Sequence, residues 1–163
     1  MIDPPAAGPV VFESVARPLL LVHAVVGFAA VGTATHFAAY AVIGALRGST
    51  TAQLRRFSAL APAALAAQAL LGFALYPTYR VRVRLGDLDR TAPAVAQLFD
   101  LKEHLAALAL ALVAAAAVAT RAGAKGNLRT WAVAALSTSG ATLVWAAAII
   151  GLYVTARHPV GGP

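Results

Sequence analysis

The segment PLLLVHAVVGFAAVGTATHFAAYAVIGAL, residues 18–46, decides the fold class of this chain. It contains no Asp, Glu, Lys or Arg over its whole length. A helix of this length rises about 43 Å, whereas the hydrocarbon core of a bilayer is roughly 30 Å thick. The segment therefore predicts a transmembrane helix that tilts or protrudes from the membrane.

Three further apolar segments follow this one along the chain. Each approaches the roughly 20 residues that a helix needs to span the hydrocarbon. Because the connections after the first and third segments are short, we expect antiparallel neighbours and an all-α integral membrane fold, a four-transmembrane-helix up-down-up-down bundle. The whole chain, 1–163, is expected to be a single membrane domain. The predicted parts are helices at 18–46, 57–76, 98–120 and 130–155, an N-terminal tail at 1–17, a longer loop at 77–97 and a C-terminal tail at 156–163.

Local signals predict where these helices begin and end. Pro18 suits the first turn of the first helix, and Ser58 is the expected N-cap of the second. Pro77 is expected to stop the second helix. The third helix has a second possible start, because Thr91-Ala92-Pro93 also reads as a cap followed by a first-turn proline.

The composition agrees with a membrane protein. Hydrophobic residues make up 60% of the 163 residues and charged residues 12%, against about 45–50% and about 25% in soluble domains, and the mean hydropathy is +0.76. These values exclude an ordinary soluble domain and a disordered chain. The chain has no cysteine, which excludes disulfides, thiolate metal sites and cysteine nucleophiles. Abundant alanine and an excess of arginine over lysine indicate a bacterial source, and hence the cytoplasmic (inner) membrane.

The net charge of +7 is interpreted as membrane-flanking charge rather than as a nucleic-acid surface, because the basic residues lie between the apolar segments. Lys and Arg are nearly equal in number on the two sides of the predicted bundle, so their count leaves the orientation open. All the acidic residues fall on the side of the longer loop. The predicted partners are the lipid bilayer and either another membrane subunit or a second copy, because little of the chain lies outside the membrane.

Ionisable groups inside membrane helices are costly and are functional candidates. The first helix carries His23 and His36, and the third begins with Asp100-Leu101-Lys102-Glu103-His104. The second and fourth helices contain none between their flanks, where Gln68 is the most polar residue apart from hydroxyls.

The leading interpretation is a b-type haem between the first and third helices. In the predicted topology these helices run in the same direction, and His23 and His104 lie at similar depths, as two axial ligands require. Arginines at the end of the second helix lie on the same side and suit haem propionates, because guanidinium groups bind carboxylates. These arginines are Arg80, Arg82 and Arg84.

His36 leaves a second arrangement open. It follows His23 by thirteen residues, so the two rings point roughly 140° apart and cannot face one cofactor on a straight helix. If the third helix starts early, His36 and His104 become the ligand pair instead. His36 and Tyr40 share a helix face, and they are alternatively expected to line a quinone pocket.

A non-haem metal site is the competing interpretation. Asp100, Glu103 and His104 share one helical face, and with His23 they give two carboxylates and two imidazoles. This ligand set suits iron, manganese or zinc. A purely structural interpretation remains beside both, with the acids paired to the loop arginines, Lys102 reaching the headgroups and Tyr79 lying at the membrane interface.

The predicted function is a small membrane redox subunit that binds haem b and exchanges electrons with a quinone or a larger complex. It would be at most an electron-transfer subunit of an oxidoreductase. In outline the plan resembles the haem-b membrane anchor subunits of quinone-linked oxidoreductases, and no residue is carried over from them. The alternative is a cofactor-free accessory or scaffold subunit of a membrane complex.

Overall fold

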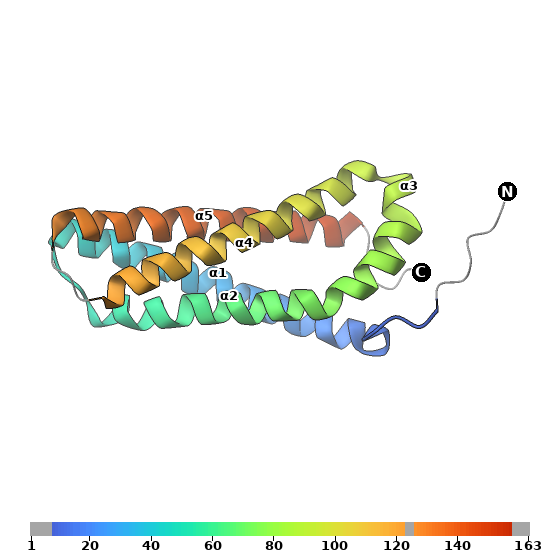
Figure 1. Cartoon of the computed structure of the whole chain (residues 1–163), viewed down its shortest axis with the longest axis horizontal. Coiled ribbons are helices and arrows are strands. Elements are labelled where there is room, and N and C mark those ends of the chain that lie inside the picture. The colour runs from blue at the N-terminus through green and yellow to red at the C-terminus, as the bar shows by residue number, and fades with distance from the viewer. Residues whose placement is uncertain (1–7, 123–125, 158–163) are drawn as a thin grey trace.

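The computed structural model describes residues 8–122 and 126–157, and in these residues the chain forms helices and no strands. Four helices in this part of the chain are long and apolar enough to cross a membrane, which confirms the predicted number of apolar helices. The long helices are α1 (Ala16–Arg47), α2 (Ala52–Thr78), α4 (Pro93–Arg121) and α5 (Asn127–Arg157) (Figure 1). The short ones are η1 (Glu13–Val15), η2 (Tyr79–Leu88) and α3 (Asp89–Thr91).

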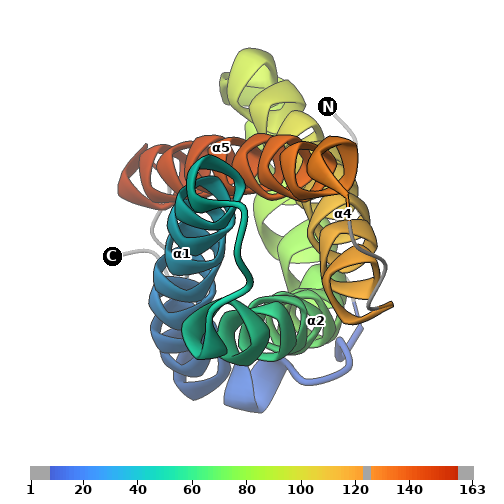
Figure 2. The ribbon, with the colours of Figure 1, turned by 90° about the vertical axis from the view of Figure 1, so that its left-hand side faces the viewer.

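The four long helices lie side by side around a common centre. Helix α1 packs against α2 and α5, and α4 packs against the same two helices, so α1 and α4 lie diagonally across the bundle (Figure 2). The connection between α1 and α2 lies at one end of the bundle, and η2 and α3 lie at the other (Figure 1). One end of the bundle thus carries a short connection, and the other carries two further helical segments.

The local signals at the helix starts are partly confirmed. Pro93 occupies the start of α4, as the second of the two predicted starts requires. The predicted cap at Ser58 is wrong, because α2 begins earlier and Thr51 caps it by accepting a hydrogen bond from the Leu54 amide at 3.1 Å. Ser58 lies inside the helix, where its hydroxyl donates to the carbonyl of Arg55. Thr51 and Ser58 can both cap a helix. Thr51 is the cap because it precedes the first turn and binds a backbone amide there that has no partner within the helix.

The predicted stop at Pro77 is also wrong. Helix α2 continues through Pro77 to Thr78 and then into η2, a π-helical segment. Membrane-type helices tolerate proline because local π-type turns restore the backbone hydrogen bonds that the missing N–H would have made. As a result, most of the predicted loop at 77–97 is helical.

The core is made mainly of alanine and lies towards the end with the α1–α2 connection. We call this part the alanine half, residues 30–65 and 109–144, and the remainder of the described chain the polar half. The buried core residues of the alanine half include Ala30, Ala34, Phe37, Ala38, Ala41, Ala45, Ala61, Ala109, Val113, Ala116, Ala117, Ala134 and Ala141. Large apolar side chains such as Phe28, Leu70 and Phe73 instead point outward. Small residues inside let helix backbones approach closely, as they do between membrane helices.

Candidate functional site

A pair of polar side chains joins α1 and α2 in the polar half. The Gln68 Nε2 and His23 Nε2 atoms are 2.9 Å apart, although the two residues are separated by 45 positions in the chain. Glycines make room for this contact. A Cβ placed on Gly27 would lie 3.2 Å from the Gln68 amide, and one on Gly72 would lie 3.6 Å from the His23 ring.

This pair leaves one buried polar atom without a partner on each residue. An amide nitrogen only donates, so His23 Nε2 accepts and the neutral ring carries its proton on Nδ1. His23 Nδ1 is then a buried donor and Gln68 Oε1 a buried acceptor, and neither has a protein partner. If the amide is turned over, the two roles exchange, and one donor and one acceptor still remain. Each residue of the pair thus keeps hydrogen-bonding capacity that no described group of the protein uses.

Lys102 brings a positive charge to the same region from α4. It lies seven residues before Ala109 and eleven before Val113, so helical periodicity places it on the core-facing side of α4. Its Cδ atom lies 3.5 Å from the position that a Cβ on Gly151 of α5 would take. The expected snorkelling of Lys102 to the headgroups is thus replaced by an inward orientation, which its place on the helix face explains.

Aromatic residues hold the Lys102 ammonium. The Nζ atom lies 4.5 Å from the centre of the Phe99 ring, a cation–π contact. The Tyr79 ring stacks on the same Phe99 ring, with the two ring centres 3.7 Å apart. The hydroxyls of Tyr79 and Thr78 are buried without a partner. Among the described residues, Lys102 forms no ion pair. The junction of α2 and η2 therefore adds further unpaired polar atoms to the polar half.

The other two histidines of the described chain point outward. His104 is exposed, and its Nδ1 donates to the carbonyl of Asp100 at 2.7 Å. His36 is exposed as well, and its Nδ1 donates to the carbonyl of Gly32 at 2.7 Å. Since a carbonyl only accepts, both rings carry a proton on Nδ1, and Nε2 remains available in each.

His36 belongs to an aromatic group between α1 and α2. Its ring stacks on Phe57 with ring centres 5.0 Å apart, and Tyr40 stacks on the same ring at 5.6 Å. The predicted shared face of His36 and Tyr40 is present, with their ring centres 6.4 Å apart. This group lies in the alanine half, apart from His23 and Gln68.

The loop arginines have protein partners in the structure. Arg82 forms a two-point ion pair with Glu13, with distances of 2.6 and 2.9 Å. Arg84 pairs with Asp100 at 2.6 Å and with Asp89 at 3.5 Å. Segment η2 is therefore tied to η1 through Glu13 and to α4 through Asp100. Arg80 of the same segment is exposed.

The structure does not bring the sequence-predicted ligands together. His23 contacts Gln68, whereas the His104 ring is exposed and held by its own helix. Within the described residues, no three His, Asp or Glu side chains are grouped in a way that could hold a metal ion. The metal site predicted from Asp100, Glu103, His104 and His23 is therefore absent from the described arrangement. The haem ligands remain a prediction.

Two residues of the site had weak signals in the sequence. Gln68 stood out as the most polar residue in the middle of the second and fourth helices. The inward direction of Lys102 follows from its spacing to the alanines of the third helix. Nothing in a single sequence indicates that Gln68 meets His23, because that contact depends on how two helices pack.

Comparison of the chain with protein-family models, with curated proteins and with solved structures gave no match.

Proposed function

We propose that the chain is an integral membrane protein whose four long helices cross a bacterial cytoplasmic membrane in up-down-up-down order. The distribution of side chains supports this proposal. Soluble proteins bury large apolar side chains, whereas here alanines fill the core and large apolar side chains lie on the outside. Leu21, Leu70 and Phe73 are each at least 69% exposed. Lipid is the environment in which such a surface is stable.

We further propose that the protein is a redox subunit that binds a membrane quinone beside His23 and Gln68. The observation that carries this proposal is the pair of unpartnered buried atoms, His23 Nδ1 and Gln68 Oε1. A quinone carbonyl accepts a hydrogen bond, and the hydroxyl of the reduced form also donates one. The His23–Gln68 pair offers one donor and one acceptor, and therefore suits both forms. Lys102 favours the negative charge that develops on a quinone oxygen during reduction.

The chain's own residues set the proton positions in this proposal. Gln68 holds the His23 ring in one tautomer, so that the pair presents one hydrogen-bond donor and one acceptor to the ligand. Gly27 and Gly72 leave the space in which the Gln68 amide and the His23 ring meet. Electrons would be exchanged with a partner subunit, in keeping with a membrane protein that has little mass outside the bilayer.

The test is quinone retention by the purified protein in lipid nanodiscs, quantified by extraction after loading with a short-chain ubiquinone analogue. We expect His23→Leu and Gln68→Leu each to lose the quinone, because each removes one of the two complementary groups. His36→Leu, which changes a histidine on the same helix outside the site, is the matched control and retains it. Equal retention in wild type, His23→Leu and Gln68→Leu contradicts the proposal.

Folding is separated from binding by the double variant. Each single substitution leaves a buried partner unsatisfied, which costs about 1–3 kcal/mol of stability. The His23→Leu/Gln68→Leu double variant removes both partners and is expected to be at least as stable as either single variant, yet empty of quinone. A cooperative thermal melt of the double variant shows that it folds. Loss of quinone from this folded variant is then assigned to binding.

Haem b is the second candidate, and a specific observation favours it. In His104 the Nδ1 proton is held by the carbonyl of Asp100 and Nε2 is free, which is the state of a ligating histidine. Because the His104 ring is exposed, its second axial ligand would come from a partner subunit or a second copy. A dithionite-reduced minus oxidised spectrum, with iron quantified on the same sample, tests this candidate. A sharp α-band that disappears in His104→Leu supports it, while a flat spectrum without bound quinone favours the scaffold alternative.

A further inference from the structure

The side of α1 that faces away from the bundle centre carries two polar side chains. His36 is exposed and Tyr40 is half-buried, and the two residues lie about one helical turn apart. The buried residues of α1, such as Ala34 and Ala41, lie about 140–160° from His36 around the helix. The His36 side chain therefore points away from the core of the four helices.

In the proposed membrane span, these two side chains lie within the hydrocarbon layer. Arg47 ends α1 and is exposed, which places it at one surface of the membrane. His36 precedes Arg47 by eleven residues, about 16 Å along the helix axis, and Tyr40 precedes it by seven, about 10 Å. Since the layer is roughly 30 Å thick, His36 lies near its middle.

Both side chains keep a hydrogen-bonding atom that the described part of the protein does not use. The His36 ring donates its Nδ1 proton to the Gly32 carbonyl, so Nε2 of the neutral ring is an acceptor. The Tyr40 ring stacks on Phe57, and its hydroxyl, which can donate, has no hydrogen-bond partner among the described residues. Lipid chains form no hydrogen bonds, so leaving these two atoms against lipid is unfavourable.

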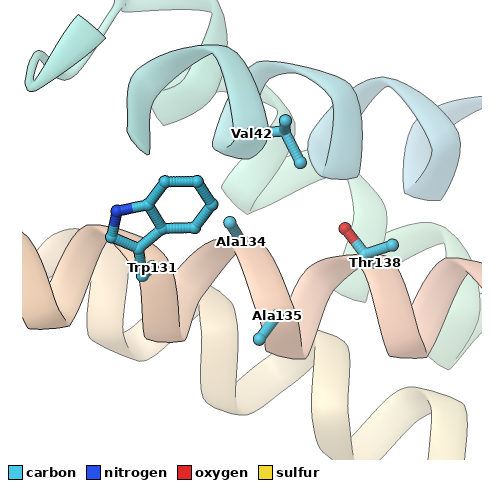
Figure 3. A pocket seen from close by; sticks show the side chains of 5 residues that line it. All are labelled: Val42, Trp131, Ala134, Ala135 and Thr138. Carbon is cyan, nitrogen blue, oxygen red and sulfur yellow. The ribbon is translucent and has the colours of Figure 1, made fainter. Parts of the chain in front are cut away.

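The side of α1 that faces α5 differs from this face. A shallow depression there is lined by Val42, Trp131, Ala134, Ala135 and Thr138 (Figure 3). Val42, which α1 contributes to this lining, lies about 120° from His36 around the helix. This side of α1 therefore presents no matched donor and acceptor, and lipid chains are sufficient to cover it.

One acceptor and one donor on the same face make the outer surface of α1 complementary to itself. In a dimer with twofold symmetry, each contact between two different residues occurs twice, with the copies exchanged. His36 and Tyr40 are about 40° apart around α1, so an interface centred between them places each His36 opposite the Tyr40 of the other copy. The long Tyr40 side chain leans towards the N-terminus of its helix, as helical side chains do, and so reaches towards the depth of His36.

We propose that this face of α1 is the interface of a homodimer, in which His36 Nε2 of each copy accepts a hydrogen bond from the Tyr40 hydroxyl of the other. The neighbouring positions allow the required close approach. Ala29 and Ala39 are exposed and lie within about 60° of His36 around the helix. Small residues such as these let two membrane helices come close together.

The test is energy transfer between dye-labelled copies in liposomes at a series of protein-to-lipid ratios, which gives the dissociation constant of the dimer. Because the chain has no cysteine, Leu128→Cys, at an 87% exposed position of α5, supplies a single labelling site. We expect His36→Leu and Tyr40→Phe each to raise the dissociation constant about tenfold, because each removes both crossed hydrogen bonds. Thr142→Val, which removes an exposed hydroxyl from α5, is the matched control and leaves the constant unchanged.

Mixing the two variants separates a direct contact from a general effect on packing. A dimer of one His36→Leu copy and one Tyr40→Phe copy keeps one of the two crossed hydrogen bonds. We therefore expect this mixed dimer to be about threefold tighter than either variant dimer. A mixed dimer that is no tighter than the variant dimers overturns the proposed contact.

Two further outcomes overturn the dimer. One is a wild type that stays monomeric at every protein-to-lipid ratio, which assigns the face to lipid or to a different membrane protein. The other is an equal dissociation constant for wild type, His36→Leu and Tyr40→Phe. The inference rests on the proposal that the four helices span the membrane, and a protein that stays in solution without detergent or lipid overturns that proposal instead. It does not depend on quinone binding, because His36→Leu is expected to retain the quinone.

Discussion

The two halves of the bundle solve the problem of packing four helices in different ways. In the alanine half, small side chains such as Ala34, Ala109 and Ala116 are almost fully buried, and the helices meet through them. In the polar half, His23 and Gln68 contact each other, and each leaves one buried polar atom without a partner. Buried polar atoms without a partner lower stability, and among the described residues the side-chain atoms in this state lie in the polar half.

The two halves also differ in what their glycines face. A Cβ on Gly140 in the alanine half would lie 2.6 Å from Val113, so nothing larger than glycine fits at that crossing. In the polar half, glycines face polar side chains instead, as Gly72 faces His23. Gly140 thus serves the close packing of two helices, whereas Gly72 leaves room for a polar side chain.

The largest loss of stability is expected when a large buried side chain is removed from the alanine half. Phe37 is fully buried, and Phe37→Ala is expected to destabilise the protein by about 3 kcal/mol through the cavity that it leaves. Phe73 is 75% exposed on the outside of α2, and Phe73→Ala is expected to change the free energy of unfolding by less than about 0.5 kcal/mol. Unfolding in mixed micelles at increasing fractions of denaturing detergent measures both. Similar losses for the two variants would show that the alanine half is not a tightly packed core.

An intermediate loss of stability is expected when an extra methyl group is added at a close helix contact in the same half. Gly140→Ala places a methyl group against Val113 and is expected to cost about 1–3 kcal/mol. Gly32 of α1, in the same half, has nothing within 4 Å of its Cβ position, so Gly32→Ala is expected to stabilise the helix by roughly 0.5–1 kcal/mol. Thermal melts of the two variants should therefore shift in opposite directions. A stabilised Gly140→Ala variant would be incompatible with the close approach of α4 and α5.

The smallest effect is expected at the edge of the polar half. Arg84→Gln removes the ion pairs with Asp89 and Asp100, which are partly exposed, and is expected to cost about 0.2–1 kcal/mol. The loss should shrink as salt is added, because salt screens exposed charges. Arg80→Gln, which changes an exposed arginine of the same segment, serves as the control. A salt-independent loss would mean that Arg84 acts through packing rather than through charge.

Much of the fold could be predicted from the sequence because apolar length is a local property. The segment at 18–46 became α1 (Ala16–Arg47), and the first-turn proline at Pro93 marks the true start of α4. The errors at Ser58 and Pro77 arose where one local signal competes with its neighbours. Thr51 supplied the cap, and π-type turns carried the helix past the proline.

The candidate site was harder to predict because it depends on which helix faces meet. His23 was identified as a candidate, but its partner is Gln68 on α2 rather than His104 on α4. The sequence places Lys102 and His104 two residues apart, and a helix turns about 200° over that distance, so only one of them can face the interior. Which one does so depends on the core positions of α4, and these become certain only when the helices are packed.

The length of α1 has a consequence for how the proposed quinone site beside His23 would be reached. His23 and Arg47 are 24 positions apart, which corresponds to about 36 Å along the helix, whereas the hydrocarbon layer is roughly 30 Å thick. If Arg47 is anchored at one surface of the bilayer, His23 lies at the depth of the opposite headgroups. A lipid-soluble molecule then arrives sideways from the acyl chains, while protons arrive from the adjacent water. Such a boundary position gives the site access to both phases without a channel through the bundle.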